Sequence, residues 1–442
     1  MLKDDGAPLT VAYLGPEASF SHQAAIGVFG PTTSTSTSTP LSSSPASAST
    51  SSNERLVSLH PLPSFSAIFS AIQNSPSSSS SSAATSETKE QIQYDFDFAV
   101  IPIENSTNGS VVQVLDLLAQ CGHETETETE PESTALSPSS AAAAATARPA
   151  LYPDVEVCAE YYLPVHHCLF VAPSSVAEHE HGSAGNHGHD DGSNSSTTKP
   201  DPPKSIRTLY THPQVWGQCG RYLAAHFPPT VVERIDMGST SAAAQLVARE
   251  GAAKKEKPQS ISHCNSTCDS VDPAPAPGIS AAIASKLAGE KHNLVCLAEN
   301  IEDEPGSNTT RFFVVRNRNH NRNSQQQLPK HLHTEHTHTQ QYYYKSLITF
   351  TIDHTRPGSL ADALAVFKQY SFNLTSIDTR PSRKRNWQYV FFVECETTHP
   401  QPEPAAGSGH KDQKLTNMLR DLRKFTESLR YLGRFEDQLR TQ

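Results

Sequence analysis

Apolar residues gather in short blocks along the chain, and polar stretches separate these blocks. Residues 10–15 (TVAYLG) read as a strand that a turn joins to a helix over 21–29, and residues 96–103 (FDFAVIPI) read as a second strand. In residues 101–118 (IPIENSTNGSVVQVLDLL) the apolar run breaks into a polar loop and resumes at helical spacing. This stretch predicts a strand, a loop and a helix.

The later blocks repeat this alternation of strands and helices. The pattern predicts two strands within 155–172 that break at Pro164, a strand at 205–212 before a helix at 213–227, a strand at 231–236 before a helix at 239–250, a helix at 281–293 and a strand at 310–316. Strands that alternate with helices predict an α/β fold with a parallel or mixed sheet.

A separate block begins near residue 343. Its strand and helix signals follow the order β, α, β, β, α, β, which is the ferredoxin-like arrangement. We therefore expect an interrupted catalytic or binding region at 9–317, a low-complexity linker at 318–342 and a second domain at 343–438.

Six tracts between the blocks are too polar or too repetitive to form a core. They lie at about 31–52, 75–90, 122–148, 175–203, 252–277 and 317–341. Since the blocks on either side still join as strand and helix units, we interpret the tracts as insertions into surface loops.

Charge and cysteine content narrow the classes of function. The 442 residues carry a formal net charge of -11, which argues against a general attraction to nucleic acid or to an anionic membrane. No apolar run reaches the roughly 18 residues of a membrane-spanning helix, so we expect a soluble, cytoplasmic protein. The eight cysteines are scattered, and several lie in apolar segments, which favours reduced thiols.

Four predicted helix starts carry short polar side chains, at 19–23, 104–110, 211–214 and 238–241. Helix starts expose unpaired backbone N–H groups and a positive dipole end, so a cleft that brought them together would bind an anion. The alternative is that each Ser, Thr or Asn is only a helix cap, worth about 1 kcal/mol.

The motifs VAYLGPEASFSHQAA, IPIENSTNGSVVQVLDLL, LPVHHCLF, THPQVWGQC, STSAAAQLVA and NIEDEPGSNTTRFFVV, followed by the terminal block, resemble in this order the prephenate dehydratase family with its C-terminal ACT domain. The insertions resemble the fungal form. The resemblance implies a two-lobed catalytic region similar to a periplasmic binding protein. It also implies decarboxylating dehydration of prephenate to phenylpyruvate in phenylalanine biosynthesis, with no metal and no organic cofactor.

The resemblance assigns catalytic importance to Thr310, which we interpret as a hydrogen-bond donor or proton relay because a threonine hydroxyl is a weak acid. Arg311 is a candidate clamp for a substrate carboxylate. Strand alternation points Arg311 away from Thr310, and a structural ion pair is an equal alternative. Glu104 is a candidate acid, or, as we favour, a group that orients Asn105 and Arg311.

The other expected substrate-binding residues come from the same motifs. They are Ser19, Phe20, Ser21, Asn105, Ser106, His212, Gln214, Ser239, Thr240, Asn308 and Phe312. Three motif histidines, His22, His167 and His212, could steer protons, although a structural role is the commoner case. The chain has Ala18 where the family usually has glycine, which would cost about 1 kcal/mol if the backbone is left-handed there.

In the terminal block, two motifs resemble the family's phenylalanine-binding motifs. They comprise Gly358, Ser359 and Leu360, and Asp378, Thr379, Arg380 and Pro381. The resemblance implies feedback inhibition by phenylalanine and a homodimer or homotetramer. The alternatives for Gly358 and Arg380 are a turn and a surface charge.

Two other functions remain open from sequence. One is an arogenate dehydratase, whose substrate carries an amino group in place of the keto group, and the other is a non-catalytic amino-acid sensor. Histidine-rich stretches at 179–191 and 331–339, and His263 with Cys264 and Cys268, lack the supporting residues of a metal site, so we expect none.

Overall fold

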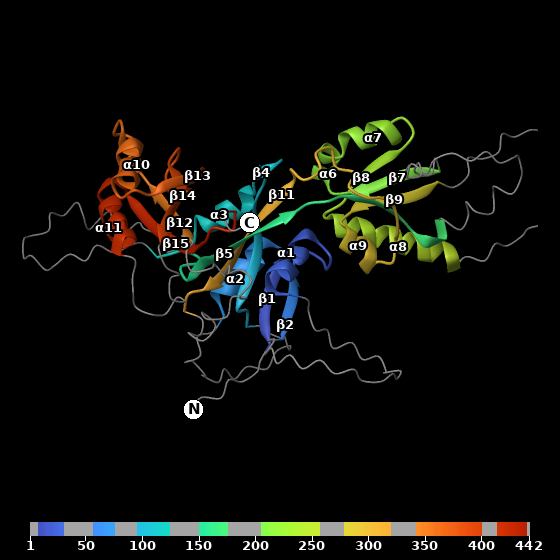
Figure 1. Ribbon diagram of the computed structural model, residues 1–442, viewed down its shortest axis with the longest axis horizontal. Coiled ribbons are helices and arrows are strands. Elements are labelled where there is room, and N and C mark those ends of the chain that lie inside the picture. Colours follow the sequence, from blue (N-terminus) through green and yellow to red (C-terminus); the bar gives the residue numbers. More distant parts are fainter. Residues whose placement is uncertain are drawn as a thin grey trace, which may run out of the picture.

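The computed structural model describes residues 8–30, 56–75, 95–123, 150–175, 205–256, 278–319, 342–399 and 413–439. They form three α/β bodies in a row, with the first lobe in the middle, the second lobe on one side and the C-terminal domain on the other (Figure 1). Each body is built around one sheet.

The first lobe holds a six-stranded sheet with the order β2-β1-β3-β11-β5, and β4 pairs with β3. Its elements are β1 (Leu9–Leu14), α1 (Phe20–Phe29), β2 (Val57–Leu62), α2 (Phe65–Gln73), β3 (Phe98–Asn105), β4 (Gly109–Ser110), α3 (Val112–Leu118), β5 (Val155–Pro164) and β11 (Thr309–Asn317). β1 runs parallel to β2 and β3, whereas β11 is antiparallel to β3 and β5. α1 packs on one face of the sheet, and α2 and α3 pack on the other.

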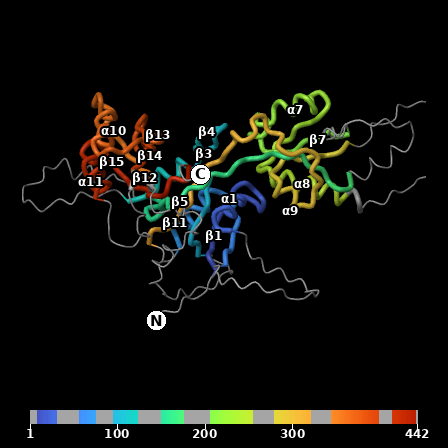
Figure 2. Tube along the Cα trace, viewed as in Figure 1, coloured from blue at the N-terminus to red at the C-terminus, as the bar shows by residue number. Residues whose placement is uncertain are grey.

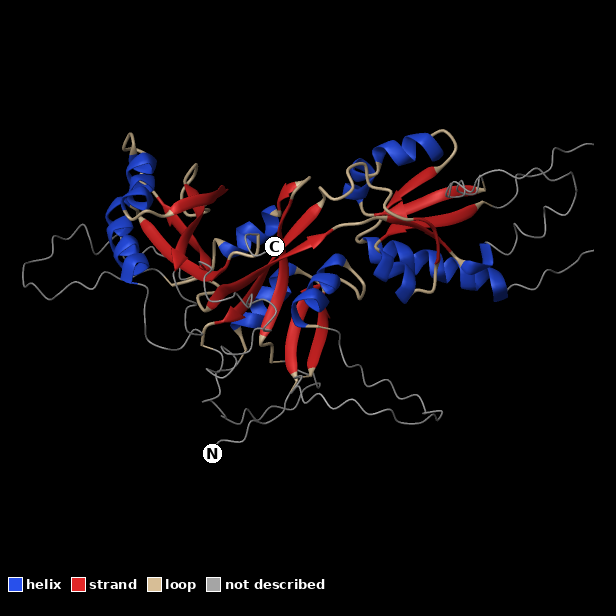
Figure 3. Cartoon of the chain, viewed as in Figure 1, coloured by secondary structure: helices blue, strands red, loops and turns tan. Residues whose placement is uncertain are grey.

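The second lobe holds a five-stranded sheet with the order β10-β6-β9-β7-β8. Its elements are β6 (Cys168–Val171), β7 (Ile206–Thr211), α6 (Pro213–Gln218), α7 (Gly220–His226), β8 (Glu233–Asp236), α8 (Thr240–Glu256), β9 (Ile279–Ala284), α9 (Lys286–Lys291) and β10 (Val295–Ala298). α6 and α7 cover one face, and α8 and α9 cover the opposite face (Figure 3).

Two neighbouring segments join the lobes. The chain leaves the first lobe after β5 and returns just before β11, and these two strands are paired along their length (Figure 2). The ends of β5 and β11 that face the second lobe therefore form a two-stranded connection.

The C-terminal domain follows the expected β, α, β, β, α, β order, and its sheet has the order β13-β14-β12-β15. Its elements are β12 (Tyr342–Thr351), α10 (Ser359–Gln369), β13 (Asn373–Pro381), β14 (Tyr389–His399), α11 (Gln413–Leu422), the short helix η3 (Arg423–Phe425) and β15 (Ser428–Glu436). Both long helices cover one face. The other face lies against the first lobe and shares a hydrophobic cluster with it.

The expected fold class, two α/β lobes followed by a ferredoxin-like domain, is confirmed. Three details of the prediction are wrong. Residues 281–284 belong to strand β9 instead of a helix, the helix expected at 213–227 is divided into α6 and α7 at Cys219, and α8 continues to Glu256 although low complexity was expected from residue 252. β2, α2 and β10 were not predicted.

The six low-complexity tracts lie outside the described residues, apart from a few positions at their ends and the C-terminal turn of α8. The same holds for both histidine-rich stretches and for His263, Cys264 and Cys268. The six described cysteines have free thiols, and five of them are buried. Within the described ranges, no helix has the length and apolar character needed to cross a bilayer.

Candidate active site

The strand ends of both lobes bring the predicted polar loops together. β1 and β3 are parallel, so the loops after Leu14 and Asn105 leave the same edge of the first sheet. β7, β8 and β9 are parallel to one another, so their following loops leave one edge of the second sheet. Carboxyl ends of parallel strands are the usual place for ligand binding in such sheets.

Direct contacts show that these two edges face each other. Ser241 donates its hydroxyl hydrogen bond to the Glu17 carbonyl at 2.5 Å, and Ser285 donates to the Ala18 carbonyl at 3.4 Å. The Phe20 ring lies edge-on to the His167 ring, with 5.8 Å between centroids. The loop before α1 therefore contacts the starts of α8 and α9 where the two lobes meet.

Asn105 links the loop after β3 to the segment that returns from the second lobe. Its Nδ2 lies within hydrogen-bonding distance of Asn308 Oδ1 at 2.8 Å, Thr310 Oγ1 at 3.0 Å and the Thr309 carbonyl at 3.3 Å. Its Oδ1 accepts hydrogen bonds from the backbone N–H groups of the next turn. Asn105 therefore fixes both the loop and the side chain of Thr310.

This contact also orients the Thr310 hydroxyl. An amide nitrogen can only donate, so Thr310 Oγ1 accepts from Asn105 and keeps its own proton for another acceptor. A neutral hydroxyl held in this way can donate to a leaving oxygen.

Ser106 makes two further hydrogen bonds between the loop after β3 and the segment that returns from the second lobe. Its hydroxyl donates to the Ser307 carbonyl at 2.5 Å and accepts from the Thr309 N–H at 2.9 Å. The expected ligands Asn105, Ser106 and Asn308 are thus brought together with Thr310. One buried polar atom here, Asn308 Nδ2, has no hydrogen-bond partner among the described residues, which leaves a donor for a ligand.

The loop before α1 adopts the strained geometry that the sequence raised as a question. Ala18 has φ 62, in the left-handed region that favours glycine. Its N–H donates to His22 Nδ1 at 2.8 Å, and its methyl is buried against residues of the second lobe. Ser19 caps α1 by accepting from the His22 N–H, so its hydroxyl has a structural role.

The remaining candidate ligands lie at the starts of three helices, α1, α6 and α8. Phe20 lies against His167, Ser21 is buried within the first turn of α1, and Gln214 is exposed at the start of α6, which His212 caps. At the start of α8, Ser239 caps the helix and Thr240 is buried.

His167 sits on the connection between the lobes with one nitrogen free. Its Nε2 contacts Gln218 Oε1 at 2.7 Å, whereas the buried Nδ1 has no partner within the described residues. Burial lowers the pKa of His167 below its usual value. His167 is therefore a neutral imidazole at neutral pH, and its ring packs against the Phe20 ring.

Sequence reasoning missed Glu302, the buried acid that fixes this connection. It accepts from the His167 N–H at 2.9 Å and contacts His166 Nδ1 at 2.8 Å. Burial opposes its charge, but these hydrogen bonds outweigh that effect and lower the pKa of Glu302. The signal was its place in NIEDEP, the acidic stretch before the Thr310 motif.

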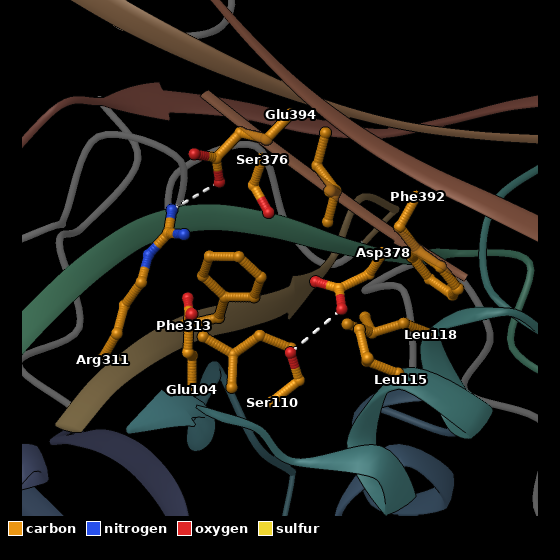
Figure 4. Close-up of a pocket in the computed structure, with 12 residues that line it drawn as sticks. Glu104, Ser110, Leu115, Leu118, Arg311, Phe313, Ser376, Asp378, Phe392 and Glu394 are labelled. Carbon is orange, nitrogen blue, oxygen red and sulfur yellow. Dashed lines mark hydrogen bonds and ion pairs between the residues drawn. The ribbon is translucent and has the colours of Figure 1, made fainter. Parts of the chain in front are cut away.

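Arg311 requires a correction, because its guanidinium does not reach the cleft. It lies on the opposite face of β11 from Thr310, where it contacts Glu160 at 2.5 Å. It also contacts Glu394 at 2.5 Å (Figure 4). Both carboxylates are buried, and their negative charges raise the pKa of Arg311 against the opposing effect of burial. Of the two alternatives open from sequence, the structural ion pair is the one observed.

Glu104 and Phe312 also differ from expectation. Glu104 lines the small cavity beside Arg311, between the first lobe and the C-terminal domain (Figure 4). Among the described residues, its carboxylate makes no side-chain hydrogen bond to Asn105 or Arg311, although Glu104 and Arg311 are strand partners. The alternation of β3 separates Glu104 from Asn105, since adjacent side chains point to opposite faces. Arg311 lies opposite Glu104 on β11, but its guanidinium is paired with Glu160 and Glu394 instead. Phe312 is 1% exposed and packs in the core beneath α1, so it is not a substrate contact.

The two motifs expected to bind phenylalanine lie at the start of α10 and at the end of β13. Gly358 caps α10 with φ 85, next to Ser359 and Leu360. Asp378 accepts from the Ser110 hydroxyl at 3.0 Å, and Arg380 pairs with Asp116 at 2.6 Å, so both side chains contact the first lobe. Thr379 and Pro381 lie beside them on β13.

Comparison with known proteins adds independent information. A family model for prephenate dehydratase matches residues 65–320. A probable prephenate dehydratase of Saccharomyces cerevisiae is 30% identical over 405 residues, covering 89% of each chain. The prephenate dehydratase of Methanocaldococcus jannaschii is 25% identical, covering 76% of this chain and 80% of its own.

Among solved structures, the prephenate dehydratase from Arthrobacter aurescens in complex with L-Phe has a similar fold. Its TM-score is 0.54 at 18% sequence identity, and the match covers 98% of this chain and 91% of the other.

Proposed function

The chain belongs to the prephenate dehydratase family, and from this premise we propose that it converts prephenate to phenylpyruvate at the junction of Asn105 and Thr310 between the lobes. The reaction releases the ring carboxylate as carbon dioxide and the ring hydroxyl as water. The observation that carries the assignment of the site is the hydrogen bond from Asn105 Nδ2 to Thr310 Oγ1 at 3.0 Å.

The reaction requires mainly that the breaking bonds are aligned and that the departing hydroxyl receives a proton. The ring becomes aromatic as both groups leave, so much of the driving force lies in the substrate. Thr310 donates its proton toward the departing oxygen, because its own oxygen already accepts from Asn105. Closure of the two lobes around the ring holds the breaking bonds in line and excludes water.

In this proposal, the N-termini of two helices stabilise the negative charge of prephenate. Arg311 is paired with Glu160 and Glu394, so the positive field comes from the N-termini of α1 and α8, which the Ser241–Glu17 hydrogen bond brings close together. Asn308 Nδ2, which has no hydrogen-bond partner in the described part of the chain, supplies a further donor close to Thr310.

The substrate is tested by offering prephenate and arogenate to the same purified chain. We expect phenylpyruvate from prephenate and a much lower kcat/KM for arogenate. A higher kcat/KM for arogenate would make the chain an arogenate dehydratase. Failure of a folded protein to turn over either compound would favour the amino-acid sensor.

Regulation by phenylalanine is the second part of the proposal. It is supported by the L-Phe complex of the Arthrobacter aurescens protein and by the motifs at Gly358–Leu360 and Asp378–Pro381 in a ferredoxin-like domain. Contacts from Asp378 and Arg380 reach β4 and α3, next to the loop that holds Asn105. Phenylalanine bound at these motifs would therefore act on the catalytic lobe through these contacts.

A homo-oligomer is also proposed, with the effector between C-terminal domains. Arg380→Ala should raise the phenylalanine concentration needed for half inhibition by at least about tenfold and leave uninhibited kcat within about twofold. Unchanged inhibition would remove Arg380 from the effector site. Light scattering with and without phenylalanine would give the oligomer size.

A further inference from the structure

Five charged side chains are buried together where the first lobe meets the C-terminal domain. None of the five is more than 10% exposed as a side chain. The cluster consists of Glu160 and Arg311 from the first lobe, and of Lys345, Glu394 and Asp437 from the C-terminal domain.

Each cation in this cluster joins the two bodies. Arg311 contacts Glu160 of its own lobe and Glu394 of the C-terminal domain, at 2.5 Å each. Lys345 contacts Glu160 of the first lobe at 2.9 Å and Asp437 of its own domain at 2.9 Å. The rings of Phe313 and Tyr162 lie 4.9 and 5.7 Å from the Arg311 guanidinium carbon. The Arg311 side chain is therefore held by two carboxylates and two aromatic rings.

Stability alone does not explain why such a cluster is placed here. A buried ion pair is often no more stabilising than well-packed apolar residues of the same volume. What sets this one apart is position, because Arg311 follows Thr310 directly in β11. The two side chains lie on opposite faces of one strand, so fixing Arg311 also fixes the backbone of Thr310.

The strand pairing beside Arg311 is irregular on one side of β11. The ladder between β3 and β11 shifts register between Arg311 and Phe312, so the end of β11 that carries Thr310 lies beyond an irregularity. A bulge weakens regular pairing and re-aims neighbouring side chains. Pairing with β5 stays in register from Thr309 to Val314, so the contacts of Arg311 add to that pairing and fix the strand end on its irregular β3 side.

Glu394 extends the connection into the C-terminal sheet. Its Oε1 accepts from the Thr375 hydroxyl at 2.6 Å, and Thr375 lies on β13, the strand that ends with Asp378–Pro381. Glu394, which pairs with Arg311, is thus hydrogen-bonded to β13, the strand that carries one of the two expected phenylalanine-binding motifs.

We propose that Arg311 and Glu394 form a positioning pair, through which the C-terminal domain holds Thr310 in its catalytic geometry. The proposal rests on the role of Thr310 given above. Arg311 does not touch substrate and acts through the backbone of its neighbour. The C-terminal domain therefore contributes to turnover as well as to regulation.

The test compares Glu394→Gln with Glu156→Gln in the full chain. Glu156 is a matched control, since it pairs with the buried Arg316 of the same strand at 2.9 Å, at the end remote from Thr310. We expect Glu394→Gln to lower kcat about tenfold or more with KM within about twofold, and Glu156→Gln to leave both within about twofold. Arg311→Lys should behave like Glu394→Gln, because a lysine cannot bridge both acids with planar geometry.

Coupling to Thr310 separates positioning from a merely structural role. Thr310→Ser keeps the hydroxyl and lowers kcat partially, and we expect the double variant with Glu394→Gln to lose less than the product of the single losses. Multiplicative losses, or equal losses for Glu394→Gln and Glu156→Gln, would overturn the positioning pair. If Glu394→Gln does not fold by thermal melting, Arg311→Lys with its matched control Arg316→Lys answers the same question.

The outcome for Thr310 itself is read separately. Thr310→Val with parental kcat would overturn the assignment of Thr310 and the positioning pair together. An inactive Thr310→Val beside a Glu394→Gln variant with parental kcat would overturn the positioning pair alone.

Discussion

At the scale of single residues, Ala18 combines a strained backbone conformation with a side-chain contact between the lobes. Its left-handed φ of 62 costs about 1 kcal/mol or more for a residue with a Cβ, while burial of its methyl returns about 0.8 kcal/mol. The family's usual glycine at this position predicted the strain correctly. The compensating contact with the second lobe could not be predicted, because it depends on how the lobes close.

Replacement of Ala18 by glycine should therefore be nearly neutral. Ala18→Gly relieves strain and removes a buried methyl, so we expect a change in unfolding free energy within about 1 kcal/mol of zero. Ala24→Gly is the matched control, since Ala24 is buried inside α1 and should cost about 2 kcal/mol through helix propensity and lost burial. Denaturant unfolding measures both, and equal losses would contradict the account.

The buried histidines predict how stability depends on pH. Burial lowers the pKa of both His22 and His167, and the Ala18 N–H donates to His22 Nδ1, which must therefore be unprotonated. The unfolded chain binds more protons than the folded chain as the pH falls below about 6.5. The stability that the two neutral histidines contribute is thus fully present above that pH and is lost as the pH falls below it.

Melting temperatures between pH 7.5 and 5.0 test this sign. The parent should lose stability as the pH falls through the window below about 6.5, and His167→Gln should lose less over the same window. An identical pH slope for the two proteins would contradict the assignment of a buried neutral imidazole to His167.

Alternation along a strand decided the roles of two candidate residues. It correctly pointed Arg311 away from Thr310, and the same rule separates Glu104 from Asn105. The sequence could not supply what lies on that second face. Glu394, the partner of Arg311, is 83 positions away in the chain and belongs to another domain.

At the scale of elements, the missed strand in 281–284 shows where local preference fails. The stretch AAIA favours a helix by propensity, but it forms the C-terminal part of β9. Small side chains are needed there because α8 packs closely on the sheet, with Ala243 and Val247 against Ala282. Tertiary packing overrides propensity at this position.

β2 and α2 were missed for a different reason. They lie between two serine-rich tracts, and the proline at the fifth position of β2 obscures its pattern. β2 is an edge strand, where a proline is tolerated.

Gly433 of β15 allows the C-terminal domain to approach the first lobe. A Cβ on Gly433 would lie 2.0 Å from the Val157 carbonyl oxygen of β5, and the residue has φ 140. Gly433→Ala should therefore lower the unfolding free energy by roughly 3 kcal/mol or disturb the contact between the two bodies.

Gly358→Ala is the control for Gly433→Ala. Gly358 is left-handed with φ 85 at the start of α10, but nothing lies within 4 Å of the place that a Cβ would occupy, so only the backbone strain of about 1 kcal/mol applies. Thermal unfolding with equal losses for both variants would show that β15 does not pack tightly against β5.

At the scale of the whole molecule, the first lobe and the C-terminal domain share one hydrophobic cluster. Leu347, Phe392 and Phe435 pack with core residues of the first lobe, and the rings of Phe313 and Phe435 are 5.4 Å apart. These two bodies should therefore unfold together. The order of elements predicted each domain, but periodicity carries no information about which surfaces of two domains meet.

Phe435→Ala tests this shared core. The variant should lose about 3–5 kcal/mol, and hydrogen exchange should show amides of β3 and β11 losing protection together with those of β12 and β15. Loss of protection confined to the C-terminal domain would contradict a shared unfolding unit. Exchange in the second lobe serves as the internal reference.

The central claim is that dehydration depends on the Thr310 hydroxyl held by Asn105 between the lobes. The most direct measurement is kcat for phenylpyruvate formation from prephenate by the parent and by Thr310→Val, which keeps the shape of the side chain and removes the hydroxyl. We predict a loss of about a hundredfold or more with an unchanged melting temperature. Parental kcat in a folded Thr310→Val protein would contradict the account.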